Sequence, residues 1–320
     1  MRIHPGLFSS VGKLARGALA IGNFDGVHLG HRALFAAARE AAARQGGPCS
    51  ALTFEPHPAR VLAPQYAPQL ITSPARKLEL FAECLVEDAV VQPFDAAFAR
   101  TEPQAFVEAL LATGVSEVVV GHDFTYGKDR GGNTESLRVA LEERGVRLRL
   151  IAPVTANGLV VSSTKVREFA LEGRLAAAAA LLGRPLDLDG WVVRGAGRGR
   201  TLGWPTANVQ TDQAQLLPAI GVYAVRVKLL GEAGNRLLPA AANLGVNPTF
   251  RESGVTAEGQ KPPLLLEVHL LDFAGDLYGR PVRVAFVERL RNERRFPHVD
   301  ALKAQIALDV AHARSLLSGS

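Results

Sequence analysis

The sequence predicts an α/β domain with a parallel sheet, followed by a smaller domain that is an antiparallel barrel or sandwich. The chain has 320 residues and is 48% hydrophobic, which is enough for two cores. From Gly17 to Arg184, strand-like apolar runs alternate with helical patterns, as in parallel sheets covered on both faces. Beyond Gly190, strand-like runs follow one another across Gly, Pro and Asn turns, which indicates antiparallel pairing.

The first domain can be read element by element. Its expected strands are GALAIGN (17–23), CSALTF (49–54), DAVVQ (88–92), EVVVG (117–121) and RLRLIAP (147–153). Its expected helices are 29–45, 74–85, 103–113 and roughly 135–144. Three polar motifs, NFDGVHLGH, TFEPHP and GHDFTYG, each follow a strand, at the edge where parallel sheets bind ligands.

The texture changes after LLGRPLDLDG, and residues 185–190 are predicted as a linker between domains 1–185 and 186–320. The expected strands beyond it are GWVVRG, GVYAVRVKLL, LLPAAANLG, LLLEVHLLDF and PVRVAFVERL. A final helix over 299–317 has apolar residues near helical periodicity and is predicted to pack on these strands. Those residues are Leu302, Ile306, Val310 and Leu317.

Composition excludes several classes of protein. Two cysteines, Cys49 and Cys84, are too few for a disulfide framework and are expected to be core thiols. The net charge of +5 suits phosphorylated ligands, but the basic residues are scattered and lack the interleaved aromatics of a nucleic-acid surface. The N-terminus has no apolar signal region and no apolar run reaches the length of a membrane span, so a soluble cytoplasmic chain is expected.

Two histidines, His28 and His31, stand around Gly30 where a strand gives way to a helix. A helix N-terminus binds phosphate through its unpaired amides and its partial positive charge. Two imidazoles on the first turn add donors to the same oxygens, and Gly30 leaves room for a nucleotide. The pattern favours a reaction in which charge develops on an α-phosphate and a departing pyrophosphate. An incidental pair of histidines is the alternative.

A second phosphate-binding element is expected in VSSTKVREFALEG, residues 161–173. Ser162 or Ser163 can cap the helix that follows. Thr164 and its neighbouring amides are then left for phosphate, and Arg167 reaches the β- and γ-phosphates from one turn along. An ordinary capped helix with a solvated arginine is the alternative.

GNFDGVHLGH, TFEPHP, GHDFTYG and SSTKVR, in this order, resemble the adenylyltransferase half of bacterial bifunctional riboflavin kinase/FAD synthetases, within the HxGH nucleotidylyltransferase superfamily. The resemblance implies a Rossmann-like domain in which His28 and His31 bind ATP phosphates and stabilise the transition state. The other ATP-binding residues that it implies are Gly22, Phe24, Gly30, Ser163, Thr164 and Arg167. It also places His57 and Asp123 near FMN or the nucleotide, although a rigid turn between two prolines is an alternative role for His57.

The second domain begins with GWVVRGAGRGRTLGWPTANV, residues 190–209, in which glycines and arginines suit a phosphate-wrapping loop. A short flexible or RNA-binding loop is the alternative. Thr206 and Asn208 would share one face of an extended segment and offer the neutral oxygens that Mg²⁺ accepts beside ATP. Glu267 is a lone carboxylate in an apolar strand, so it is either a general base or a solvent-facing residue beside His269.

GRGRTLGWPTAN, NLGVNPTF, EVHLLDFAGDLYGRPVRVAF and LRNERRF resemble the riboflavin kinase module, a small β-barrel. The resemblance implies that Thr206 and Asn208 hold Mg²⁺ with ATP and that Glu267 is the catalytic base. ATP contacts are implied for Gly197, Arg198, Gly199 and Arg200, and flavin contacts for Arg291, Glu293 and Phe296. This chain has Trp204 where the family usually has Phe, and RESGVTAEGQKPP makes the loop before Glu267 longer than is typical.

The two resemblances support each other, because the two families catalyse successive reactions. We therefore expect an enzyme that phosphorylates riboflavin to FMN in its second domain and adenylylates FMN to FAD in its first, using Mg²⁺ with ATP and neither nucleic acid nor membrane. An HxGH transferase for another substrate, with a barrel that only binds flavin, is one alternative. A flavin-binding regulator that contacts RNA is the other.

Overall fold

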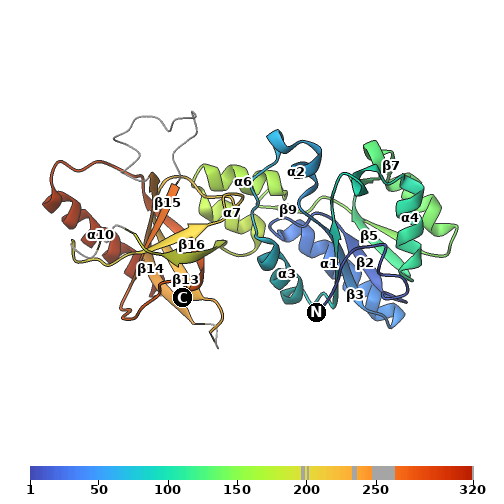
Figure 1. Cartoon of the computed structure of the whole chain (residues 1–320), viewed down its shortest axis with the longest axis horizontal. Helices are drawn as coiled ribbons and strands as arrows, with labels where there is room; N and C mark the ends of the chain where they lie inside the picture. Colours follow the sequence, from blue (N-terminus) through green and yellow to red (C-terminus); the bar gives the residue numbers. More distant parts are fainter. Residues whose placement is uncertain (196–198, 200–201, 233–235, 247–263, 319–320) are drawn as a thin grey trace. The chain divides into compact units, whose positions relative to one another are not determined.

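The computed structural model describes residues 1–195, 199, 202–232, 236–246 and 264–318. The chain divides into two compact units, Met1–Ser163 and Thr164–Ser320 (Figure 1). Within the described ranges, no helix has both the length and the apolar character that crossing a membrane requires.

The first unit contains the predicted parallel sheet, with six strands in the order β1-β4-β3-β2-β5-β8. The strands are β1 (Arg2–His4), β2 (Ala18–Ile21), β3 (Cys49–Glu55), β4 (Asp88–Pro93), β5 (Glu117–Gly121) and β8 (Arg147–Ile151). Their pairing is parallel throughout. Sequence reasoning missed β1, because this short edge strand is largely exposed and has no apolar run.

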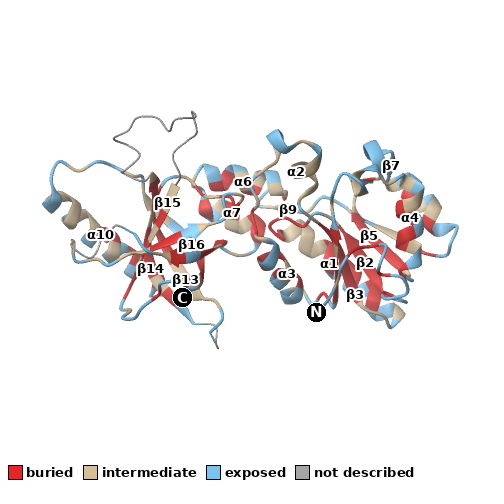
Figure 2. Cartoon of the chain, in the orientation of Figure 1, coloured by how far each residue is buried: buried red, intermediate tan, exposed pale blue. Residues whose placement is uncertain are grey.

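Helices cover both faces of the sheet. They are α1 (Leu29–Gln45), α3 (Pro74–Glu83), α4 (Pro103–Ala112) and α5 (Thr134–Glu142). Successive residues of β2 point to opposite faces, so Ala18 and Ala20 pack in the core with α1 and α3, while Leu19 and Ile21 pack with α4 and α5. Figure 2 shows β2, β3 and β5 as buried between these layers.

Shorter elements complete the first unit and lead into the second. The helices are α2 (Pro58–Leu62), α6 (Ser163–Leu171), α7 (Leu175–Leu182) and the single turns η1 (Pro64–Tyr66), η2 (Phe98–Arg100) and η3 (Lys128–Arg130). The short strands pair as β6 (Thr125–Tyr126) with β7 (Gly132–Asn133), and β9 (Thr155–Ala156) with β10 (Leu159–Val160).

The second unit is a closed antiparallel barrel in the order β11-β12-β15-β14-β13-β16, which decides between the barrel and the sandwich. The strands are β11 (Leu186–Val193), β12 (Ala207–Thr211), β13 (Gly221–Leu229), β14 (Leu237–Val246), β15 (Leu264–Leu270) and β16 (Pro281–Arg291). The final helix α10 (Val299–Leu317) packs on β13 and β14 as predicted, through a cluster that includes Ala224, Ala241 and Ala313.

The prediction of a linker over residues 185–190 is wrong, because β11 begins at Leu186. Leu186 and Leu188 are buried. The carboxylate of Asp189 accepts a hydrogen bond at 2.6 Å from Nε of Arg283, which lies on the neighbouring strand β16. The alternation of leucine and aspartate is the two-residue period of a strand. The charges and Gly190 gave this segment the composition of a turn.

Candidate active sites

The turn between β2 and α1 lies where the order of the parallel sheet reverses. β3 pairs with one edge of β2 and β5 with the other, and such a point is the usual ligand site of an open α/β sheet. α1 begins at Leu29, and His28 is its N-cap. The Nδ1 atom of His28 accepts a hydrogen bond from the backbone N–H of His31 at 3.3 Å. We call residues 28–31 the HxGH turn.

The two imidazoles of the HxGH turn are stacked, with ring centroids 3.5 Å apart and planes 15° apart. Because His28 Nδ1 accepts a hydrogen bond, neutral His28 carries its proton on Nε2 and can donate it. Burial, with a further contribution from His28 and from the Lys77 ammonium, holds the pKa of His31 well below its usual value. Among the described residues, the buried Nδ1 of His31 has no hydrogen-bond partner. The low pKa of His31 thus favours a neutral imidazole at the second histidine of the turn.

Phe24 supports the HxGH turn from inside the core. Its side chain is fully buried and meets His31 edge to face, with ring centroids 5.3 Å apart. The φ angle of Phe24 is +53°, which is uncommon for a residue with a side chain. A Cβ at Gly22 would lie 3.0 Å from the Phe24 ring, so Gly22 makes room for this packing.

Asp25 ties three segments of the first unit together, a role that sequence reasoning missed. Its buried carboxylate accepts hydrogen bonds from the backbone N–H groups of Ile71 and Thr72, at 3.0 and 3.1 Å. Its backbone carbonyl accepts a hydrogen bond from Ser163 Oγ at 2.9 Å. Ser163, at the start of α6, is thereby bonded to the segment that leads into the HxGH turn.

A buried cation, Lys77 of α3, also escaped sequence reasoning. Its Nζ lies 3.2 Å from Glu55 Oε2, 3.3 Å from Thr53 Oγ1 and 3.5 Å from the carbonyl oxygen of Asn23. These partners stand at the carboxyl ends of β2 and β3, the edge of the sheet that carries the HxGH turn. The spacing of Lys77 along α3 resembles that of any core-facing helix position, so only the fold reveals it.

The other predicted residues of the first half differ in their surroundings. Thr164 is exposed and Arg167 is half-buried, and both follow Ser163 in the first turns of α6. His57 is the N-cap of α2, since its Nδ1 accepts a hydrogen bond from Ala59 N–H at 3.2 Å, so it has the structural role kept open for it. The Asp123 side chain is 83% exposed, just beyond β5.

The barrel carries a cavity of about 550 Å³ on its side, which we call the barrel cavity. Residues that the sequence singled out for three different ligands line this one space: Gly199, Thr206, Asn208, Glu267, Arg291, Glu293 and Phe296. Gly197, Arg198, Arg200 and the segment RESGVTAEGQKPP lie outside the described residues.

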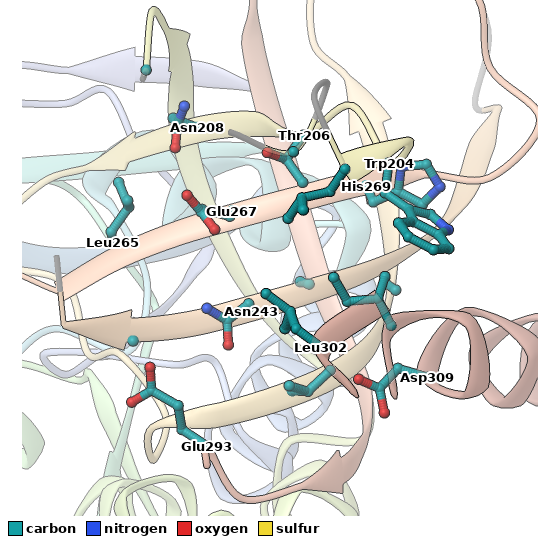
Figure 3. A pocket seen from close by; sticks show the side chains of 18 of the residues that line it. Trp204, Thr206, Asn208, Asn243, Leu265, Glu267, His269, Glu293, Leu302 and Asp309 are labelled. Atoms are coloured by element: carbon teal, nitrogen blue, oxygen red, sulfur yellow. The ribbon is translucent and has the colours of Figure 1, made fainter. Parts of the chain in front are cut away.

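Glu267 faces the barrel cavity from β15. Leu265, Glu267 and His269 line it, whereas the alternate residues Leu266 and Val268 are buried in the barrel. In register, Glu267 stands opposite Asn208 of β12 on one side and Asn243 of β14 on the other (Figure 3). Glu267 therefore faces a cavity, and Asn243 lines the same cavity. The signal for Asn243 was a polar residue in the Ala-rich strand LLPAAANLG.

Close approach explains two glycines of the GAGRGR segment. A Cβ at Gly195 would lie 1.7 Å from Asn208 Nδ2, and one at Gly199 would lie 2.4 Å from the Trp204 carbonyl oxygen and 2.8 Å from Thr206 Oγ1. The Trp204 N–H also donates to the Gly199 carbonyl at 2.9 Å. These glycines let the backbone at residue 195 lie directly against Asn208 and the backbone at residue 199 lie directly against Thr206.

The first unit presents the start of a long helix at the reversal point of a parallel sheet, and the second presents a carboxylate in a cavity of a barrel. These are features of a transferase with one candidate site in each unit. The model of the FAD synthetase family matches residues 12–165, and that of the riboflavin kinase family matches residues 182–317.

The chain belongs to the bifunctional riboflavin kinase/FMN adenylyltransferase family, whose two activities convert riboflavin to FMN and FMN to FAD. It is 42% identical to the bifunctional enzyme of Escherichia coli K12 over 298 residues, covering 92% of this chain and 91% of that one. It is 34% identical to the Haemophilus influenzae enzyme over 320 residues, covering 99% and 100%.

A solved structure from Streptococcus pneumoniae shares the fold. It is 32% identical, with a TM-score of 0.84 and 97% of each chain covered. That protein is described as a macrolide-efflux protein.

Proposed function

We propose that the HxGH turn is the adenylylation site. The FMN phosphate oxygen attacks the α-phosphorus of ATP, the bond to the β-phosphate bridging oxygen breaks, and pyrophosphate leaves. The FMN phosphate is already ionised at neutral pH, so no enzyme base is needed. His28 and His31 donate hydrogen bonds to the phosphate oxygens on which charge develops, with the amides of α1 beside them. The stacked pair of imidazoles at a helix start carries this proposal.

The remaining residues of this site receive roles by position. Ser163, fastened to Asp25, brings Thr164 and Arg167 to the triphosphate as parts of one helix start. Because the side chain of Phe24 is fully buried, Phe24 is proposed to contact ATP through its backbone, and the same is proposed for Gly22 and Gly30. His57 and Asp123 are proposed to border the FMN side of the site.

We propose further that the barrel cavity is the kinase site. The primary hydroxyl of the ribityl chain attacks the γ-phosphorus of ATP, ADP leaves, and Glu267 accepts the hydroxyl proton. Glu267 stands beside Asn208 on one cavity wall, and this juxtaposition carries the assignment. Gly199, with Gly197, Arg198 and Arg200, is proposed to contact ATP, and Arg291, Glu293 and Phe296 are proposed to contact the flavin.

Magnesium bound with ATP fits the oxygen atoms of the barrel cavity. Thr206, Asn208 and Glu267 line it together, and a hydroxyl, an amide oxygen and a carboxylate are donors that Mg²⁺ accepts. Within the described part of the chain, no group of three His, Cys, Asp or Glu residues forms a metal cage. Mg²⁺ is therefore proposed to enter with ATP, where it neutralises phosphate charge.

The division of labour predicts the order of products. With riboflavin, ATP and Mg²⁺, a chromatographic time course is expected to show FMN rising first and FAD following.

Glu267→Gln is expected to abolish FMN formation while the variant still converts supplied FMN to FAD. His31→Ala is expected to do the reverse. If a well-folded variant loses both activities equally, the two sites are not separate as proposed.

A further inference from the structure

We propose that Asp309 is a positioning residue of the kinase site: through Arg291 it holds residues 291–296, one wall of the barrel cavity, against α10. We call residues 291–296 the flavin wall. The proposal rests on the proposed assignment of this wall to the flavin. Asp309 itself is given no contact with the reacting atoms.

Asp309 is buried on α10 and fully engaged with neighbouring side chains. Its carboxylate accepts hydrogen bonds from Arg291 Nε at 2.9 and 3.0 Å, from Arg291 Nη2 at 2.7 Å and from Gln305 Nε2 at 2.8 Å. Two parallel bonds from one guanidinium fix its plane as well as its position. Burial of a carboxylate costs free energy unless the carboxylate is paired, and the bonds from Arg291 offset this cost.

Arg291 passes this constraint to the flavin wall. It is the last residue of β16, and its Nη1 donates to the Asn292 carbonyl at 3.0 Å. The guanidinium groups of Arg291 and Arg294 lie 5.7 and 4.9 Å from the centre of the Phe296 ring. Arg294 also donates to Gln305 on α10. One aromatic ring and two cations are thus joined to α10 through Asp309 and Gln305.

The location of Asp309 points to the binding site rather than to general stability. Asp309 lines the barrel cavity together with Leu302, Ile306 and Val310 of the same helix. Figure 3 shows Asp309 on the helix and Glu267 on a strand across the cavity. Loss of Asp309 is therefore expected to disturb the flavin wall and to leave the strand that carries Glu267 in place.

α10 offers a matched control in its other ion pair. Arg314 donates to Asp272, and the two side chains are 50% and 70% exposed. Neither residue lines the barrel cavity. Both Asp272→Asn and Asp309→Asn remove the carboxylate of an ion pair between α10 and another segment. The pair of Asp272 lies away from the cavity.

The test compares Asp309→Asn with Asp272→Asn in the full chain. Asp309→Asn is expected to raise the riboflavin KM of the kinase step about tenfold or more, the scale on which misplaced binding groups act. Its kcat should stay within about twofold, since Glu267 is untouched. Adenylylation of supplied FMN should be unchanged, as should all kinase constants of Asp272→Asn. A lowered melting temperature with an unchanged riboflavin KM, or a loss confined to kcat, overturns the proposal.

Two further variants separate the ways in which the proposal can fail. Gln305→Leu removes the bonds of Gln305 to Asp309 and Arg294 but leaves Asp309 paired with Arg291, so it is expected to raise the riboflavin KM by less. Arg291→Gln is expected to raise it at least as much as Asp309→Asn, and the double variant to be no worse than Arg291→Gln alone. If Arg291→Gln leaves the KM unchanged, the flavin wall is wrongly assigned. If Arg291→Gln raises the KM and Asp309→Asn does not, the positioning role is wrong.

Discussion

At the HxGH turn, the surroundings favour an uncharged imidazole. His31 is packed against Phe24 and His28, and the Lys77 ammonium is near, so protonation of His31 is disfavoured by burial first and by these charges next. A bound triphosphate would offset that effect, because a nearby anion stabilises the protonated form. If ATP binds at this turn as proposed, His31 would donate from a neutral ring at first and would gain positive charge more readily once the phosphates are in place.

The lowered pKa of His31 predicts a pH dependence of stability without ligands. The unfolded chain takes up this proton as the pH falls through about 6.5, whereas the folded chain does so only at lower pH. Protonation thus favours the unfolded state, and the stability of the first unit should fall between about pH 7 and pH 5.

Thermal melting at a series of pH values checks this prediction. His31→Asn is expected to lose less stability on acidification than the unaltered chain. His122→Asn, which removes a mostly exposed imidazole, is the control and is expected to keep the whole decrease. An equal decrease in His31→Asn would contradict the prediction.

Asp25 is expected to matter for ATP binding through the segments that it joins. Asp25→Asn would replace the carboxylate oxygen that lies 3.1 Å from Ile71 N by an NH₂ donor facing this N–H group, at a cost of about 1–3 kcal/mol in unfolding free energy. The ATP KM of adenylylation should rise, because a shift of the backbone at residue 25 would also move Ser163, whose Oγ donates to the Asp25 carbonyl. Asp95→Asn is the matched control, since Asp95 accepts a backbone N–H from Phe98 in an exposed loop. Denaturant unfolding and adenylylation kinetics measure both effects, and equal behaviour of the two variants would refute the role.

At the scale of elements, the long helices were the most predictable parts of the chain. α1 and α10 begin and end at the predicted residues, because apolar periodicity defined their length and polar caps defined their starts. The strands β11 and β12 were recognised least well. Residues 186–190 of β11 were taken for a linker, and β12 was not among the expected strands, since pairing with neighbouring strands leaves no local mark in the composition of these segments.

The site residues divide in the same way. His28, His31, Thr206, Asn208 and Glu267 stood in short motifs whose residue types suit phosphate and magnesium. Asp25, Lys77 and Asp309 have bonding partners that are distant in the sequence, so a single sequence could not reveal their roles.

The segment before β12 predicts a selective lesion. In Gly199→Ala, the new methyl group would collide with the Trp204 carbonyl and approach Thr206 Oγ1, and neither is the flexible end of a long side chain. The kinase rate is expected to fall at least about tenfold, because Thr206 must move from its position. Adenylylation of supplied FMN in the same variant serves as the control. A kinase rate within twofold of the original would contradict the close packing described here.

At the scale of the whole molecule, the contacts and the motifs divide the chain at different places. The compact units part at Ser163, while the sequence predicts a functional boundary at residue 185. Residues 164–185 include α7, which packs on β11 and β16 and buries Leu175, Leu181 and Leu182. By packing, this helix belongs with the barrel.

A pair of fragments tests where the second domain begins. Fragment 164–320 is expected to unfold at a higher urea concentration than fragment 186–320, because each buried leucine of α7 contributes about 1.5–3 kcal/mol. Both midpoints come from the same fluorescence or circular-dichroism titration. Equal midpoints would show that the barrel does not need α7.

The two units differ in whether their sheets have free edges at which molecules could associate. A ring of six paired strands has no edge on which a strand of another molecule could add. The parallel sheet ends at β1 and β8, and each edge carries arginines: Arg2, which pairs with Asp88, and Arg147 and Arg149. Charged edges discourage strand addition but do not remove the edge itself. In folded protein at high concentration, strand addition is therefore expected at the sheet of the first unit and not at the barrel.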